Sequence, residues 1–308
     1  MSVRGLVLLG ALALTGCAAG AAEDARPAPV TTVGTDPADA PDRRVETFEL
    51  TWTDPTRPTP PQGGFAGADD RTIRVRFYVP AGGPPAPLVV FAHGNNSVPE
   101  QYELPLRALA RRGYAVAAPA YPGTNAEAPG GASPADLASQ PGDTSFVIDR
   151  VVAANDTPGP LRGRVDPEHI AVAGHSVGGF TAGEVAFSET CGDDRIDAVI
   201  VMAAGFGGCA GRRTPDRGVS LLVIHGDADT NVPYALGRSA FGAAARPKYL
   251  LTVIGGSHSG DVRGGAGAGA RAVDATVLAF LDATLRNSPT ALAALRPIPD
   301  VTRWDARP

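Results

Sequence analysis

Apolar and polar residues follow distinct patterns along the chain from residue 45 onward. The runs 45–53 and 72–79 alternate apolar with polar residues, which predicts a leading pair of antiparallel strands. Later runs are largely apolar, as expected of strands that are covered on both faces. These predicted strands span 88–92, 114–118, 170–173, 198–202, 220–224 and 249–254.

Helical stretches separate or follow these strands. The predicted helices cover about 100–112, 142–154, 177–188, 233–245 and 271–286. Asp143 is a candidate cap for the second of them. Repeated strand–helix units predict an α/β fold with a mostly parallel, doubly wound sheet and helices on both faces. We find no internal repeat and no second domain.

The N-terminal segment differs from the rest of the chain. After Arg4, residues 5–16 are uncharged, which is typical of a signal peptide, and they are too few to span a bilayer as a helix. We therefore expect a signal peptide over 1–16. Residues 17–44 are rich in Ala, Pro and Asp without apolar periodicity, and this composition predicts a flexible tether.

The predicted catalytic domain spans residues 45–287, and residues 288–308 are expected to form a C-terminal tail packed loosely on the surface. The formal net charge of −5 argues against nucleic acid as the main partner, because a nucleic-acid-binding domain needs a basic surface to neutralise phosphates.

The most informative motif is Gly174-His175-Ser176-Val177-Gly178, a G-x-S-x-G pentapeptide between a predicted strand and a predicted helix. In such a strained turn, glycines two before and two after the serine avoid collisions with the neighbouring strand and helix, and the serine hydroxyl is exposed above the sheet. This arrangement is typical of serine hydrolases.

A serine nucleophile needs a base within hydrogen-bond reach and an acid that orients the base. Asp227 and Asp229 follow the predicted strand 220–224, and His258 follows the strand 249–254. The carboxyl ends of parallel strands meet at one edge of a sheet, so these side chains are expected to converge there. The chain order Ser176, Asp229, His258 is that of α/β-hydrolases.

From about residue 45 to 286 the chain resembles the α/β-hydrolase superfamily. Three stretches carry the resemblance: Val89–Gly94, Gly174–Gly179 and the run from Gly226 to Pro233 that reads Gly-Asp-x-Asp-x-x-Val-Pro. It is most similar to the branch that holds cutinase-type polyester hydrolases and chlorophyllase-like and platelet-activating-factor-acetylhydrolase-like esterases.

The resemblance implies a single-domain α/β-hydrolase fold. It assigns the acid to the aspartate three residues before the Val-Pro pair, which is Asp229, and leaves Asp227 to the turn. The segment 119–139 is the only room for a lid, so no large cap is expected.

The oxyanion formed during attack on a carbonyl needs two hydrogen-bond donors. In this fold one is the N–H of the residue after the nucleophile, here Val177. The other follows a His-Gly pair after the third strand, which the resemblance places at Asn95, with Asn96 as the alternative.

The other histidines are expected to have structural roles. His175 is expected to point away from the site, His93 and His225 to fix turns, and His169 to lie on the surface. Scattered histidines without ligand spacing indicate no metal site, and the proposed chemistry needs no cofactor.

The cysteines suggest export. Leu14-Thr15-Gly16-Cys17 resembles the lipobox of bacterial lipoproteins, in which the cysteine is lipidated; the alternative is a secretory signal with a coincidental cysteine. Cys191 and Cys209 form an even pair, which favours a disulfide in an exported protein, the alternative being two unpaired core residues.

Together these features predict a membrane-anchored serine hydrolase on the outer face of a bacterial cell membrane, or a secreted one if Cys17 is not lipidated. The expected reaction is cleavage of small or polymeric carboxylic esters by a monomer. A serine peptidase, amidase or acyltransferase would use the same residues. A non-catalytic lipoprotein that binds partners at the cell surface is the other alternative.

Overall fold

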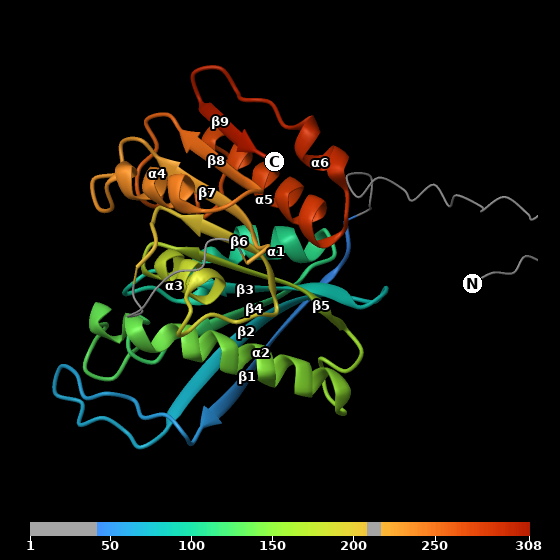
Figure 1. The fold of residues 1–308 in the computed structure, drawn as a ribbon. Helices are drawn as coiled ribbons and strands as arrows, with labels where there is room; N and C mark the ends of the chain where they lie inside the picture. The colour runs from blue at the N-terminus through green and yellow to red at the C-terminus, as the bar shows by residue number, and fades with distance from the viewer. Residues whose placement is uncertain (1–41, 208–216) are drawn as a thin grey trace, which may run out of the picture. The chain divides into compact units, whose positions relative to one another are not determined.

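A twisted sheet of nine strands runs through the centre of the described structure (Figure 1). The structure is a computed structural model that describes residues 42–207 and 217–308. The strand order is β1-β2-β4-β3-β5-β6-β7-β8-β9. The strands are β1 (Val45–Asp54), β2 (Arg71–Pro80), β3 (Ala86–Ala92), β4 (Ala115–Ala120), β5 (Val165–His175), β6 (Ile196–Met202), β7 (Ser220–Gly226), β8 (Lys248–Val253) and β9 (Thr302–Arg307).

The strands from β4 to β8 pair in parallel, whereas β1, β2 and β9 pair antiparallel to their neighbours. The sequence therefore predicted the leading antiparallel pair and the parallel centre correctly. The helices are α1 (Glu103–Arg111), α2 (Gln140–Asp156), α3 (Val177–Phe187), α4 (Tyr234–Ala243), α5 (Ala268–Leu285) and α6 (Pro289–Ala294), with the short 3-10 helices η2 (Pro99–Tyr102) and η3 (Pro134–Ser139).

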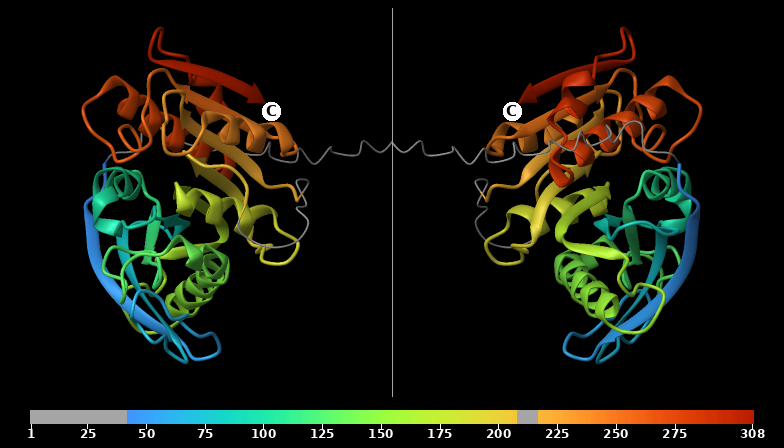
Figure 2. Two further views of the ribbon diagram at one scale, coloured as in Figure 1. Left: turned by 90° about the vertical axis from the view of Figure 1, so that its left-hand side faces the viewer. Right: turned by 90° about the vertical axis from the view of Figure 1, so that its right-hand side faces the viewer.

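Helices cover both faces of the sheet, as Figures 1 and 2 show. Successive residues of a strand point to opposite faces, so the apolar run of β3 contributes side chains to the core on each face of the sheet. Leu88 and Val90 pack in the core under α2, α3 and α4. Val89 and Phe91 pack in the core under α1 and α5. This two-sided burial explains why the central strands are apolar throughout.

Residues 288–308 were expected to form a loose surface tail, and this prediction is wrong. They carry α6 and the edge strand β9, which pairs with β8. Trp304 stacks on Tyr249 with ring centroids 5.5 Å apart. The stacked aromatic pair and the backbone ladder hold the C-terminal segment against the sheet.

Asp143 was a candidate cap for its helix, and this prediction is also wrong. The helix α2 begins earlier, at Gln140, directly after η3. Asp143 is fully buried and accepts hydrogen bonds from Arg71 at 2.6 and 2.7 Å. Arg71 is itself fully buried and also donates to Asp136 at 2.6 Å. A buried cation between two carboxylates thus links β2 to η3 and α2.

The segment before α2, which had been expected to offer the only room for a lid, is tied to the body of the domain. Asp136 accepts a hydrogen bond from the Gly123 N–H at 3.0 Å. From the β1–β2 loop, the Gln62 carboxamide donates to the carbonyls of Gly123, Pro129 and Gly131. These contacts fix the segment in place.

Replacing Arg71 by Met is expected to lower the free energy of unfolding by about 3–5 kcal/mol, because it leaves Asp136 buried without its cation. Arg74→Met is the matched control on the same strand. Its partners Glu49, Glu100 and Glu127 are all at least one-third exposed, so the expected loss is about 0–1 kcal/mol. Urea unfolding followed by circular dichroism measures both. Equal losses in the two variants would contradict the special role of the buried cluster.

Candidate active site

The chain turns sharply from β5 into α3 at Ser176. Ser176 has φ 57° and ψ −122°, a backbone conformation that residues other than glycine rarely adopt. Two neighbouring glycines allow the turn. A Cβ atom on Gly174 would lie 2.0 Å from the Gly178 carbonyl oxygen, and one on Gly178 would lie 2.1 Å from that of Ala92. Side chains at these two positions would therefore collide with the neighbouring backbone, as the pentapeptide predicted.

The structure brings the predicted serine, histidine and aspartate together. The Ser176 Oγ atom lies 2.9 Å from His258 Nε2. On the other side of the imidazole ring, His258 Nδ1 lies 2.7 Å from Asp229 Oδ2. Ser176 follows β5, Asp229 follows β7 and His258 follows β8, so all three lie beyond the carboxyl ends of parallel strands.

Asp229 is held as an anion by its surroundings. Its side chain is fully buried, and burial alone would raise its pKa. The N–H groups of Val232 and Asn231 donate to Oδ1 at 2.9 and 2.8 Å, and with His258 they hold the pKa below its ordinary value. A carboxylate in this position keeps His258 Nδ1 protonated, which leaves Nε2 free to accept the serine proton.

The second aspartate of the turn has a different environment. Asp227 accepts a hydrogen bond from the Gly255 N–H at 2.7 Å and pairs with Arg303 at 2.8 Å. It joins the loop after β7 to the loop after β8 and to β9. The structure therefore brings Asp229, and not Asp227, to His258.

The expected oxyanion donors lie beside the serine. Val177 is the first residue of α3, and the first N–H groups of a helix have no partner within it. A Cβ atom on Gly94 would lie 3.4 Å from the Ser176 Cβ, so Asn95 directly follows a residue that packs beside the serine. The Asn96 N–H already donates to the Thr124 carbonyl at 2.8 Å. This bond favours Asn95 over Asn96 as the backbone donor.

Three other histidines have the structural contacts that were expected. The Tyr121 N–H donates to His93 Nε2 at 3.1 Å, and His93 Nδ1 then donates to the Gly94 carbonyl. Burial lowers the pKa of His93 to about 4, so its ring is neutral near pH 7. His225 Nε2 lies 3.0 Å from the Val232 carbonyl oxygen and fixes the Asp229 turn. His169 pairs with Asp166 at the domain surface.

His175 was expected to point away from the site, and this prediction is wrong. Its ring lies beside that of His258, with centroids 4.8 Å apart, and is 2% exposed. The alternation of β5 was the signal that could have found it. Ala171 and Ala173 pack on the α1 and α5 side of the sheet, and His175 continues that row toward the loop that carries His258.

The structure describes only part of the cysteine predictions. Cys191 is disulfide-bonded. Cys209, its expected partner, and Cys17 lie outside the described residues, so the pairing and the lipidation stay predictions. Within residues 42–207 and 217–308, no group of three or more His, Cys, Asp and Glu side chains could hold a metal ion. No helix in that part of the chain is long and apolar enough to cross a membrane.

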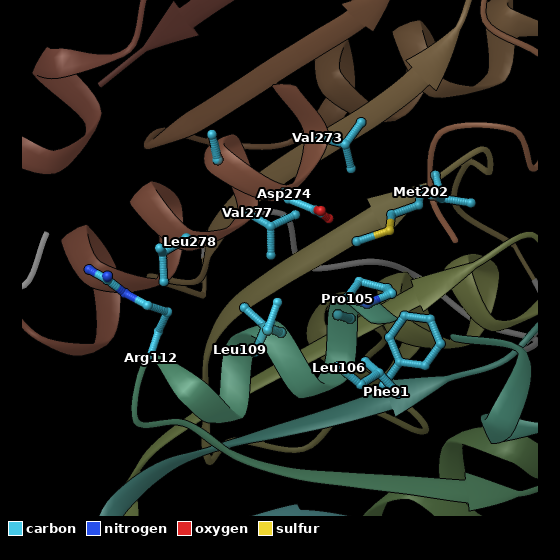
Figure 3. A pocket seen from close by; sticks show the side chains of 14 residues that line it. Phe91, Pro105, Leu106, Leu109, Arg112, Met202, Val273, Asp274, Val277 and Leu278 are labelled. Carbon is cyan, nitrogen blue, oxygen red and sulfur yellow. The ribbon is translucent and has the colours of Figure 1, made fainter. Parts of the chain in front are cut away.

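A separate cavity of about 180 Å³ lies between α1 and α5 (Figure 3). It is lined mainly by apolar side chains, including Phe91, Leu109, Met202 and Val277. Asp274 also lines the cavity, and burial raises the pKa of its carboxyl group to about 6. Ser176, Asp229 and His258 do not line this cavity, so it is distinct from the candidate active site.

Comparison with known proteins identifies the family of this chain. The sequence profile of the alpha/beta hydrolase family matches residues 89–307. A ferulic acid esterase from Streptomyces cinnamoneus has a similar structure, with a TM-score of 0.60, 23% sequence identity, and coverage of 85% of this chain and 94% of that chain. No curated protein sequence matches. The fold is widespread, since 989 chains of solved structures match, and it does not by itself decide the substrate. Because the family profile covers most of the chain, the chain belongs to the alpha/beta hydrolase family.

Proposed function

We propose that this protein is a serine esterase that cleaves carboxylic esters through an acyl-enzyme. The observation that carries the proposal is the continuous hydrogen-bond line from Ser176 Oγ through the His258 ring to Asp229. A serine hydroxyl is a weak nucleophile unless a base and an orienting acid activate it in this way. Family membership supports hydrolysis, and we propose an ester as the substrate, the class for which the ferulic acid esterase of the same fold is named.

In the first half of the reaction, His258 Nε2 takes the proton of Ser176 as Oγ attacks the ester carbonyl carbon. The carbonyl oxygen becomes an oxyanion that accepts hydrogen bonds from the backbone N–H groups of Val177 and Asn95. When the tetrahedral intermediate collapses, the C–O bond to the alcohol breaks, and His258 gives its proton to the departing oxygen. The acyl group stays on Ser176 as an ester.

In the second half, a water molecule gives a proton to His258 Nε2 and attacks the acyl carbon. Collapse of the new intermediate breaks the bond to Ser176 Oγ, which recovers the proton from His258, and the carboxylic acid leaves. Asp229 stays ionised throughout and stabilises the positive charge on the imidazole ring. These steps require no cofactor.

The surroundings of the site favour an open cleft. Ser176 is only partly buried, and the His258 side chain is 15% exposed. The segment before α2 is fixed by Asp136 and Gln62 rather than placed as a large cap. An open cleft suits bulky esters and exposed polymer chains, which is the kind of substrate that cutinase-type enzymes cleave. We propose that the protein acts as a monomer.

We further propose that the protein is exported and anchored through lipid on Cys17 to the outer face of the bacterial cell membrane. Several acyl chains on one residue would hold it there, because each buried methylene contributes roughly 0.8 kcal/mol. The paired state of Cys191 supports export, since disulfides persist in oxidising compartments. Cys209 is its proposed partner.

Ser176→Ala is expected to abolish the hydrolysis of nitrophenyl acetate and labelling by a fluorophosphonate probe, with little change in melting temperature. Loss of a triad serine lowers kcat by about 10⁴-fold or more. An aminoacyl amide assayed alongside separates esterase from amidase activity. An unlabelled wild-type protein would support the binding-lipoprotein alternative, and residual turnover above about one part in a thousand would place the nucleophile elsewhere.

Asp229→Asn and Asp227→Asn form a matched pair within one turn. The first is expected to lower kcat by about 10⁴-fold, because an amide in place of the carboxylate favours the wrong tautomer of His258. The second removes the ion pair with Arg303 and is expected to affect stability more than rate. Steady-state kinetics and thermal melting measure the two effects. Equal rate losses would remove Asp229 from the proposed site.

Cys17→Ala is expected to prevent lipidation, so that the protein stays as an uncleaved precursor or leaves the membrane fraction. A soluble form that starts at Ala18 is expected to stay fully active, because the described fold begins at β1. Fractionation, mass spectrometry and the ester assay provide the measurements. Wild-type protein free in the medium with no added mass at Cys17 would favour an ordinary secretory signal.

A further inference from the structure

A buried chain of hydrogen bonds runs behind the candidate triad. The Gly94 N–H donates to the Tyr102 hydroxyl oxygen at 3.3 Å. The Tyr102 oxygen lies 2.8 Å from His175 Nδ1, and His175 Nε2 lies 2.8 Å from the carbonyl oxygen of His258. Tyr102 is fully buried and His175 is 2% exposed, so both side chains are shielded from solvent.

The chemistry of the partners fixes the direction of each bond. A carbonyl oxygen can only accept, so His175 Nε2 carries the proton that bonds to His258. In a neutral ring Nδ1 then accepts from the Tyr102 hydroxyl, whose oxygen in turn accepts from Gly94. Burial lowers the pKa of His175 to about 4, which keeps the ring neutral near pH 7. A neutral ring can lie 4.8 Å from His258 without repelling the imidazolium that forms during turnover.

This chain of bonds joins three segments that are distant in the sequence. Gly94 precedes the oxyanion donor Asn95, His175 precedes Ser176, and the carbonyl belongs to His258 itself. The loop that carries His258 is rich in glycine, with positive φ at Gly255, Gly264 and Gly265. Glycine allows these conformations but increases the entropy lost when the loop is ordered. The position of the imidazole ring therefore depends on contacts that anchor this backbone.

We propose that Tyr102 and His175 are positioning residues that hold the His258 backbone and the Gly94–Asn95 loop in register with Ser176. The inference rests on the proposed esterase function and adds to it a support that lies outside the triad. Neither side chain touches the substrate. Their effect is on the distance between His258 Nε2 and Ser176 Oγ, and a displacement of about 1 Å in such a geometry can lower the rate on the order of 100-fold.

Tyr102→Phe tests the inference with a matched control. Tyr114 is also fully buried, and its hydroxyl donates at 2.6 Å to Asp282, remote from the triad. Each substitution by Phe removes one buried hydroxyl and keeps the ring. Tyr102→Phe is expected to lower kcat for nitrophenyl acetate and the rate of fluorophosphonate labelling roughly 10-fold, with KM changed less than about threefold. Tyr114→Phe is expected to lower the melting temperature at least as much and to leave both rates unchanged.

His175 offers a second comparison. His175→Phe fills the same space without a donor and is expected to lower kcat on the order of 100-fold. His175→Gln keeps an N–H for the His258 carbonyl and an oxygen for the Tyr102 hydroxyl, so it is expected to recover most of that loss. Both variants are measured as folded proteins, with circular dichroism and melting curves recorded first.

The possible outcomes distinguish a failure of the positioning role from a failure of the proposed esterase function. A wild-type protein that neither turns over esters nor reacts with the probe would overturn the proposed function and the inference with it. A reactive wild type with unchanged rates in folded Tyr102→Phe would overturn the inference alone. Equal rate losses in Tyr102→Phe and Tyr114→Phe would do the same, because they would reflect stability rather than position. No recovery in His175→Gln would exclude the bond to the His258 carbonyl as the cause.

Discussion

The close approach of β3, β5 and α3 around Ser176 is the constraint on which the site depends. A serine at φ 57° costs on the order of 1–3 kcal/mol and persists only when the surrounding packing leaves no alternative. Gly178 lies so close to the Ala92 backbone that no side chain fits between them. The Ser176 N–H also donates to the Met202 carbonyl at 2.9 Å, which ties the turn to β6. Relaxing the turn would therefore disturb three strands at once.

Two kinds of electrostatic interaction hold the loops of the domain in place. Away from the triad, buried Arg71 lies between Asp136 and Asp143 and fixes the segment before α2. Within the triad, no Arg or Lys of the described residues forms an ion pair with Asp229. Backbone N–H groups, His258 and the buried His225 ring, whose Nε2 lies 3.3 Å from Oδ2, stabilise its charge instead. The difference suits the proposed chemistry, because a fixed cation beside Asp229 would weaken its stabilisation of the imidazolium that the mechanism forms on His258.

Much of the fold and of the candidate triad could be predicted because their signals are local. Alternating runs revealed β1 and β2, and apolar runs revealed the strands from β3 to β8. The elbow pentapeptide and the Gly-Asp-x-Asp turn pointed to Ser176 and Asp229. The misses all depend on contacts between distant segments. The sequence around Asp143 indicates a helix cap, because its true partner Arg71 is 72 residues away. The strand β9 has exposed alternate residues, so its sequence resembles that of a surface tail. The stacking of Trp304 on Tyr249, which holds it to the sheet, is visible only in the structure.

The role of His175 also depends on contacts between distant segments. These contacts show that each residue of the candidate triad is held in place in a different way. The backbone strain and glycine packing at the elbow fix Ser176, and a tight turn with two N–H donors fixes Asp229. His258 has neither support, since it lies in a glycine-rich loop after β8. In the proposed mechanism its ring must accept a proton, carry it and release it without leaving the line between the other two residues. A bond from strand β5 to the His258 carbonyl restrains the backbone and leaves the two ring nitrogens to Asp229 and Ser176. His175, the last residue of β5, makes that bond from the position directly before Ser176.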